Sequence, residues 1–266
     1  MSQPTHPSAA LSELVSIAIA AGREILAVYG QEFEARQKAD LSPVTAADEA
    51  AEHVILEGLK AMDPLTPVIS EEAASGGKIP AVARRFYLVD PLDGTKEFIG
   101  RNGEFTVNIA LIDDKKPISG VVYAPALGRM FCGEQAAGAC ETRFDPADPP
   151  AAFTWKKLAV RERPHDGVTV VASRSHRDEK TDAYLRTLRV KKLVSAGSSL
   201  KFCLLAAGEA DLYPRFGRTM EWDTAAGQAV LAAAGGFVHT ETGTPLTYGK
   251  CERGYDNPPF IAFGSR

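Results

Sequence analysis

Residues 84–114 constrain the fold more than any other part of the chain. Residues 86–89 form a short apolar run that favours β-structure and ends at Asp90-Pro91, so we predict a buried strand there. Because proline cannot donate a hydrogen bond within a sheet, we expect the backbone to leave the sheet at Pro91. Asp93-Gly94-Thr95 is then typical of a turn that opens a helix, with Asp93 as a candidate N-cap.

Asp90 and Asp93 therefore stand three residues apart at the carboxyl end of a predicted strand, beside the free amides of a helix start. Carboxylates bind hard cations such as Mg²⁺, and amides at a helix N-terminus bind phosphate oxygens. The turn thus supplies both parts of a metal-assisted phosphoryl site. A purely structural interpretation stays open, because Asp and Pro are common turn formers and Asp is a common cap.

Further acidic residues stand at comparable places. Glu71 and Glu72 follow a short predicted strand at residues 67–70, and Asp223 begins an alanine-rich helix. Asp48 lies in the first turn of a predicted helix whose Thr45 completes a capping-box pattern. Each has an ordinary role as a solvated charge or a helix cap. Together with the pair above, they form a candidate ligand set for two or three hard cations.

Composition indicates an ordinary globular protein. The 266 residues are 45% hydrophobic and 24% charged, and the net charge of −4 does not favour binding to long nucleic acids. The four cysteines match neither a zinc site nor a disulfide framework, so we expect reduced, mostly buried thiols. We identify neither a membrane span nor a secretory signal peptide in this sequence.

The order of predicted elements indicates a mixed α/β fold in layers. Helices are predicted at residues 11–29, 45–62 and 178–188, and further helices follow Gly197 and Asp223. Consecutive strands fill residues 106–144, whereas strands and helices alternate after residue 168. The proline-rich segment 145–152 is the candidate boundary between an N-terminal half, residues 1–145, and a C-terminal half, residues 155–266.

Gly197-Ser198-Ser199 opens a further predicted helix. This is the second helix N-terminus, after that at Gly94-Thr95, that carries small residues. Such a start suits a phosphate or a ribose hydroxyl, although a plain capped helix explains the same residues. Several other phosphate chemistries are disfavoured. The sequence has no P-loop motif, no G-x-S-x-G and no cysteine in a C-x₅-R loop.

Three motifs resemble the signatures of the lithium-sensitive, Mg²⁺-dependent inositol monophosphatase-like superfamily: Glu71-Glu72, Asp90-Pro-Leu-Asp-Gly-Thr95 and Trp222-Asp223-Thr-Ala-Ala-Gly. The resemblance extends in order from Asp48 to Gly236. The longer motifs at residues 90–108 and 197–217 are similar to those of its bacterial 3'(2'),5'-bisphosphate nucleotidases. Members that act on inositol typically have Thr-Asn-Phe where Lys96-Glu97-Phe98 stands here.

The resemblance implies stacked α/β/α/β/α layers with the active site between the two halves. Glu71, Asp90 and the carbonyl of Leu92 would hold a first Mg²⁺, and Asp90, Asp93 and Asp223 a second. A third would be held loosely by Glu71. The implied catalytic residues are Asp48, Thr95 and Glu71, with Thr95 and Asp48 accepting a proton from the attacking water. The implied substrate-binding residues are Glu71, Leu92, Asp93, Gly94, Thr95, Lys96, Gly197, Ser198, Arg215 and Asp223.

The implied reaction is hydrolysis of adenosine 3',5'-bisphosphate to AMP and phosphate, in sulfate assimilation, with inhibition by Li⁺. Gly94-Thr95 would take the scissile phosphate. Lys96, Arg215 and Arg218 are candidates for the second phosphate, although solvated charges explain them equally well.

Two other functions stay open at this point. One is an inositol or sugar monophosphatase on the same scaffold, and the other is a metal-dependent nucleotide-binding protein without turnover. The expected ligand is a small nucleotide, and the chain would act as a monomer or homodimer. It would work in the cytoplasm, free or attached peripherally to the inner membrane.

Overall fold

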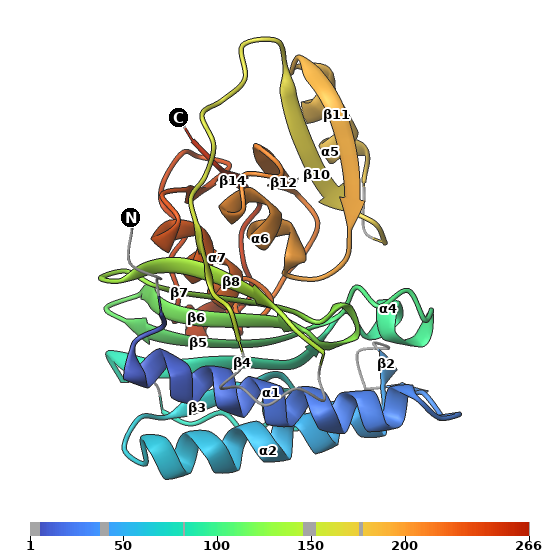
Figure 1. Cartoon of the computed structure of the whole chain (residues 1–266), viewed down its shortest axis with the longest axis vertical. Coiled ribbons are helices and arrows are strands. Elements are labelled where there is room, and N and C mark those ends of the chain that lie inside the picture. Colours follow the sequence, from blue (N-terminus) through green and yellow to red (C-terminus); the bar gives the residue numbers. More distant parts are fainter. Residues whose placement is uncertain (1–5, 38–42, 82, 146–152, 176–177, 266) are drawn as a thin grey trace.

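The computed structural model describes residues 6–37, 43–81, 83–145, 153–175 and 178–265. Layers of helix and sheet alternate along its long axis (Figure 1). Helices α1 (Ala9–Tyr29) and α2 (Ala46–Met62) cover one face of a seven-stranded sheet. Helices α6 (Leu200–Ala206) and α7 (Ala225–Ala233) separate it from a five-stranded sheet, whose far face carries α5 (Glu179–Arg186). These α/β/α/β/α layers confirm the predicted fold class.

The seven-stranded sheet takes strands β3 to β8 from before the expected boundary and β9 from after it, and it is antiparallel apart from the parallel pair β3 and β4. Its strands follow one another in chain order, as the run of strand signals predicted. They are β3 (Val68–Ser70), β4 (Arg85–Asp93), β5 (Thr106–Asp113), β6 (Lys116–Ala124), β7 (Arg129–Glu134), β8 (Gly138–Arg143) and β9 (Lys156–Leu158).

The five-stranded sheet has the order β11-β10-β12-β14-β13. Its strands are β10 (Val168–Ser173), β11 (Val190–Ala196), β12 (Leu212–Arg215), β13 (Phe237–Thr240) and β14 (Phe260–Phe263). Residues 146–152 of the expected boundary lie outside the described residues, and β9 beyond them still pairs with β8. The division into residues 1–145 and 155–266 stays a prediction.

Shorter elements connect these layers. Thr45 caps α2 in the predicted capping box with Asp48, and Gly30 ends α1 as expected. A two-stranded hairpin follows α1, and α3 directly follows β3. These elements are β1 (Arg36–Gln37), β2 (Pro43–Val44), α3 (Glu71–Ser75), α4 (Thr95–Ile99) and the 3₁₀ turns η1 (Pro125–Leu127) and η3 (Cys251–Arg253).

Two local predictions around β4 are wrong. Asp90 pairs with Asn108 and Asp93 with Thr106, so three steps along β4 face two steps along β5. The strand therefore continues past Pro91 through a β-bulge, where no ladder hydrogen bond from the proline is needed. The N-cap of α4 is Gly94 at φ 92°, not Asp93. Glycine adopts this left-handed conformation without the steric cost of a side chain.

Helix α7 lies very close to the seven-stranded sheet because β6 and β7 carry glycines beneath it. A Cβ on Gly120 would lie 2.8 Å from both the Ala226 carbonyl oxygen and the Ala229 Cβ. A Cβ on Gly133 would lie 2.8 Å from the Cα of Val230. The close approach fixes how far from this sheet the segment immediately before α7 lies.

The thiols and the helices agree with the sequence expectations. Cys132, Cys140 and Cys203 are buried, Cys251 is exposed, and all four are free. Among the described residues, no helix combines the length and apolar character needed to cross a membrane.

The packing under α7 predicts that Gly120→Ala destabilises the protein by about 1–3 kcal/mol, the usual cost of overpacking. Gly30→Ala is the control, because Gly30 has φ −72° and its Cβ would meet only the Leu26 carbonyl oxygen, at 3.4 Å. That change should alter the free energy of unfolding by no more than about 0.5 kcal/mol. Urea unfolding measures both, and equal stabilities would contradict the packing argument.

Candidate active site

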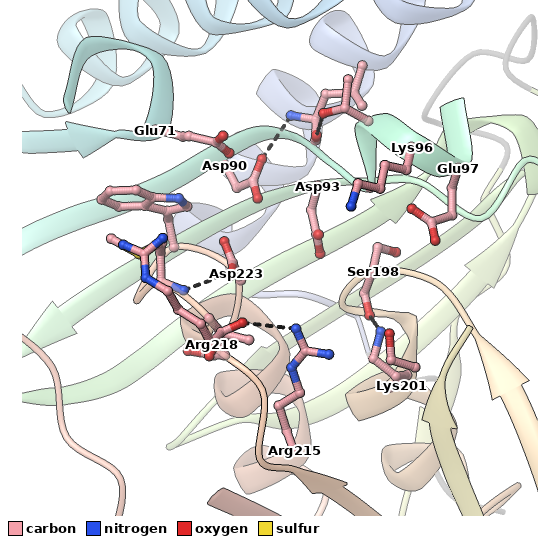
Figure 2. Close-up of a pocket in the computed structure, with 18 of the residues that line it drawn as sticks. Glu71, Asp90, Asp93, Lys96, Glu97, Ser198, Lys201, Arg215, Arg218 and Asp223 are labelled. Carbon is pink, nitrogen blue, oxygen red and sulfur yellow. Dashed lines mark hydrogen bonds between the residues drawn. The ribbon is translucent and has the colours of Figure 1, made fainter. Parts of the chain in front are cut away.

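A cavity of about 440 Å³ opens at the bulged end of β4, between residues from before and after the expected boundary. The N-terminal half lines it with the start of α3, the turn after β4 and α4. The C-terminal half lines it with the loop before α6, the end of β12 and the loop before α7. Carboxylates gather on one side of the cavity, and cationic side chains approach from another (Figure 2).

The structure brings the predicted acidic residues together from three separate elements. Glu71 begins α3, Asp90 lies near the end of β4, and Asp223 stands just before Thr224, the N-cap of α7. Each offers an oxygen, and these oxygens lie within 4.8 Å of one another. Asp93 points toward the same space from β4 (Figure 2). Such a set of oxygen donors suits a hard divalent cation.

The bulge explains why Asp90 and Asp93 serve one site. In a regular strand, residues three apart point to opposite faces of the sheet. Here β4 has one residue more than β5 between the pairs Asp90–Asn108 and Asp93–Thr106. The bulge therefore shifts the in-and-out alternation of side chains along β4, and both carboxylates line the cavity. The position of the bulge therefore decides the composition of the site.

Crowding and burial oppose ionisation of these carboxylates. Burial, followed by the charges of Glu71, Asp93 and Asp223, raises the pKa of Asp90 well above its usual range. Burial also raises the pKa of Asp223, with Asp93 next in importance. Burial raises the pKa of Asp93 to about 6, although Lys201 and Asn108 act in the opposite direction. A bound cation would favour the charged forms.

Hydrogen bonds hold the three aspartate carboxylates in place. The Leu92 amide donates to Asp90 Oδ1 at 3.1 Å, and the Met220 amide donates to Asp223 Oδ2 at 2.8 Å. Asn108 Nδ2 donates to Asp93 Oδ2 at 3.2 Å and to Ser199 Oγ at 3.1 Å. Ser199 Oγ in turn donates to the Asp223 carbonyl oxygen at 2.6 Å. Asn108 and Ser199 thus connect the acidic segments of the two halves.

Thr95 and Asp48 form the predicted pair beside the carboxylates. Thr95 Oγ1 donates to Asp48 Oδ1 at 3.3 Å and lies 3.4 Å from the Leu92 carbonyl oxygen. Asp48 is 1% exposed, and its Oδ2 accepts from the Thr45 amide at 2.7 Å and from Thr45 Oγ1 at 2.8 Å. The capping box therefore fixes the carboxylate that faces Thr95.

The cationic side of the cavity includes a residue that sequence reasoning missed. Lys201 is 5% exposed and donates from Nζ to the Ser198 carbonyl oxygen. Burial lowers the pKa of Lys201 to about 8, with Asp93 opposing the shift. Arg215 is 8% exposed, and Ser198 Oγ is buried with no hydrogen-bond partner among the described residues. A lysine in the otherwise apolar start of α6 was the available signal.

Other predicted substrate residues have different surroundings. Lys96 is exposed and extends over the cavity beside Asp93 (Figure 2). Arg218 lies at the rim, where its Nε donates to Asp256 at 2.9 Å. The Gly197 amide donates to Glu104 Oε2 at 2.8 Å, and Gly197 is not among the described residues that line the cavity.

Gly94 and Thr95 line the cavity as predicted, beside a second residue that sequence reasoning missed. Glu97 is 4% exposed and accepts a hydrogen bond from Ser175 Oγ at 2.5 Å. The roles of all these side chains stay predictions.

The model of the inositol monophosphatase family matches residues 7–260. The chain therefore belongs to this family, as its motifs predicted. Among curated relatives, the 3'(2'),5'-bisphosphate nucleotidase CysQ of Escherichia coli (strain K12) is 48% identical over 256 residues, which are 94% of this chain and 98% of that protein. The nucleotidase of the same name from Aggregatibacter actinomycetemcomitans is 35% identical over 94% of this chain and 91% of its own length.

Solved structures agree in fold. CysQ from Bacteroides thetaiotaomicron, a bacterial member of the family, superposes with a TM-score of 0.80 at 36% identity, covering 95% of this chain and 96% of its own. The IMPase of Thermotoga maritima has a TM-score of 0.77 over 96% of this chain and 91% of its own. At 22% identity, this second likeness concerns the fold alone.

The raised carboxylate pKa values predict how stability without metal depends on pH. Because Asp93 has an ordinary pKa of 3.8 and a folded-state pKa of about 6, the folded state binds its proton more tightly. The contribution of this tighter proton binding to the free energy of unfolding is fully present below about pH 4 and is lost as the pH rises through about 6. In the presence of a chelator, the stability of Asp93→Asn relative to wild type should therefore rise by on the order of 1–3 kcal/mol between pH 4 and pH 8.

Urea unfolding of both proteins across this range measures the difference in unfolding free energy. Saturating Mg²⁺ at pH 8 should stabilise the wild type more than Asp93→Asn, because a cation that binds only the folded state adds to its stability. A stability difference that does not change with pH would contradict the assignment of Asp93 to a crowded acidic cluster.

Proposed function

We propose that the protein is a Mg²⁺-dependent 3'(2'),5'-bisphosphate nucleotidase that removes the 3'-phosphate of adenosine 3',5'-bisphosphate, giving AMP and phosphate in sulfur assimilation. The observation that carries the proposal is one cavity with carboxylates at Asp90 and Asp223 and buried cations at Lys201 and Arg215. A substrate with two separated phosphates uses both sides. The 48% identity to a nucleotidase over nearly the whole chain supports the same substrate.

The acidic cluster would hold Mg²⁺. Glu71, Asp90 and the Leu92 carbonyl suit one ion, and Asp90, Asp93 and Asp223 a second, while a third would depend mainly on Glu71. When bound, Mg²⁺ neutralises phosphate charge and makes a coordinated water more acidic. The shifted pKa values of Asp90, Asp93 and Asp223 support this assignment, since buried like charges need a compensating cation.

Thr95 and Asp48 would move the proton of the attacking water. Because Thr95 Oγ1 donates to Asp48 Oδ1, the lone pairs of that hydroxyl are available to accept a proton from water. The hydroxyl proton then passes to Asp48, whose position the two Thr45 hydrogen bonds fix. Gly94, next to Thr95 in the turn, would help to orient the scissile phosphate. No covalent phosphoenzyme is required.

The second phosphate would bind on the opposite side of the cavity. Lys201 and Arg215 supply buried positive charge, and Ser198 supplies a hydroxyl that lacks a partner among the described residues. Lys96 would add a charge from the first half. Arg matches phosphate geometry with paired donors, so Arg215 would orient this group. These residues favour a bisphosphate over a monophosphate substrate.

The cytoplasm stays the predicted location. Attachment to a membrane surface receives no support from the described residues. The inositol or sugar monophosphatase and the non-catalytic nucleotide-binding protein stay as alternatives that an activity assay separates.

Phosphate release from adenosine 3',5'-bisphosphate, inositol 1-phosphate and fructose 1,6-bisphosphate, with and without Mg²⁺, tests the proposal. We expect Mg²⁺-dependent release, fastest from the adenosine bisphosphate, and inhibition by Li⁺. Asp93→Asn should lower kcat by orders of magnitude while circular dichroism shows an intact fold. Preference for another substrate would favour an alternative, and wild-type turnover by Asp93→Asn would remove that residue from the site.

Thr95→Ala should lower kcat by roughly 10²–10⁴-fold, the usual contribution of a positioned proton acceptor. Thr95→Ser keeps the hydroxyl and should retain most of the activity. Thr187→Ala is the matched control, because Thr187 is an exposed residue at the end of α5 whose hydroxyl donates to the Tyr184 carbonyl. Steady-state kinetics at saturating substrate measures all three. An unchanged kcat in Thr95→Ala would exclude the proton transfer described here.

A further inference from the structure

Glu104 links the two halves next to the cavity without lining it. It precedes β5 in the N-terminal half, and the two partners of its carboxylate belong to the C-terminal half. Glu104 Oε2 accepts from the Gly197 amide at 2.8 Å, while Oε2 and Oε1 accept from Arg174 Nε and Nη2, each at 2.9 Å. Glu104 is not among the described residues that line the cavity.

The loop that Glu104 holds is packed without spare room. A Cβ on Gly197 would lie 2.6 Å from the Glu104 carbonyl oxygen and 2.8 Å from Glu97 Cγ, so only glycine fits. The next residue, Ser198, has φ 45°, a left-handed conformation that a serine rarely adopts. A strained residue of this kind persists only where its surroundings hold it. The Glu104 hydrogen bond is one such restraint.

Ser198 and Lys201 depend on the course of this loop. Ser198 Oγ is buried without a partner among the described residues, and the Ser198 carbonyl oxygen accepts from Lys201 Nζ. Both residues line the cavity. Figure 2 shows Ser198 above Lys201, opposite Asp93 and Lys96. A shift of the Gly197 backbone would therefore move both groups relative to the carboxylates of the first half.

We propose that Glu104 is a positioning residue for substrate specificity. Its carboxylate anchors the Gly197 amide and thereby places Ser198 and Lys201 for the phosphate that is not cleaved. The inference rests on the function proposed above, because it assumes that a second phosphate binds to these residues. It concerns Glu104 and the hydrogen bond to Gly197, not the chemistry at the scissile phosphate.

The hydrogen bond from the Gly197 amide to Glu104, rather than the ion pair of Glu104 with Arg174, carries this role. The Arg174 side chain is 45% exposed, and exposed ion pairs contribute little because water and salt screen them. Gly197 is a buried residue, and removal of the Glu104 side chain would leave its amide without this acceptor. Loss of Glu104 should therefore matter more than loss of Arg174.

The experiment compares two substrates, adenosine 3',5'-bisphosphate and adenosine 3'-monophosphate, which lacks the second phosphate. Both are assayed with Mg²⁺ in wild type and variants. Wild type must first hydrolyse the bisphosphate with the higher kcat/KM. Failure of that requirement would refute the proposed function, and with it the premise of this inference, before any variant is compared.

Glu104→Ala should raise KM for the bisphosphate roughly 10-fold, as expected when the amide of a buried residue loses its acceptor. Its kcat, and kcat/KM for the monophosphate, should stay within about 2-fold of wild type. Glu104→Gln keeps an acceptor for the Gly197 amide, and Arg174→Ala keeps Glu104, so both should stay within about 3-fold. Asp113→Asn is the matched control, because Asp113 ends β5 and pairs with Arg84 and Arg85 far from the cavity.

Glu104→Asp keeps the charge and shortens the side chain, so it should raise KM for the bisphosphate alone even if Glu104→Ala does not fold. Equal losses on both substrates would show a merely structural role and overturn the proposal. An effect of Glu104→Gln as large as that of Glu104→Ala would assign the effect to charge. An equally large effect of Arg174→Ala would assign it to the ion pair. Either of these results would also overturn the proposal.

Discussion

The mutual repulsion of the clustered carboxylates is the constraint on which the rest of the site depends. Asp90, Asp93 and Asp223 have raised pKa values because burial and neighbouring charge disfavour ionisation. Without a cation, the clustered carboxylates therefore cost free energy, and the contacts around them must hold them together. Backbone amides and Asn108 supply the donors that hold it. A bound divalent cation would compensate the negative charges and make the same arrangement favourable.

Two backbone irregularities make that arrangement geometrically possible. The bulge around Pro91 brings Asp90 and Asp93 to one side, and Gly94 at φ 92° turns the chain sharply into α4. A regular strand followed by a capped helix would have separated the two carboxylates. In the same half, Gly120 and Gly133 let α7 approach the sheet closely, and Asp223 stands just before that helix. The bulge and these glycines thus determine where the carboxylates meet.

The sequence predicted the fold class, the capping box and the meeting of the carboxylates, and it missed the backbone irregularities of β4 and the buried charges beside them. The capping box of Thr45 and Asp48 was readable because both partners lie in one turn. The convergence of distant carboxylates was a hypothesis from the residues, and family resemblance strengthened it. The bulge at Pro91 was missed because proline normally ends a central strand. Lys201 was missed because lysine is seldom buried, and only the surrounding fold shows that its charge is directed into the cavity.

The position of the site between the halves has a mechanical consequence. Asp93 and Asp223 come from different halves, yet Asn108 and Ser199 join their segments through hydrogen bonds of 3.2, 3.1 and 2.6 Å. Asn108 and Ser199 are 0% and 1% exposed, so water does not compete for these bonds. The bonds therefore hold the Asp93 carboxylate and the backbone of Asp223 in place relative to each other. Of these three bonds, the one from Asn108 to Ser199 passes between the halves, so a displacement of one half against the other would act on this buried contact directly.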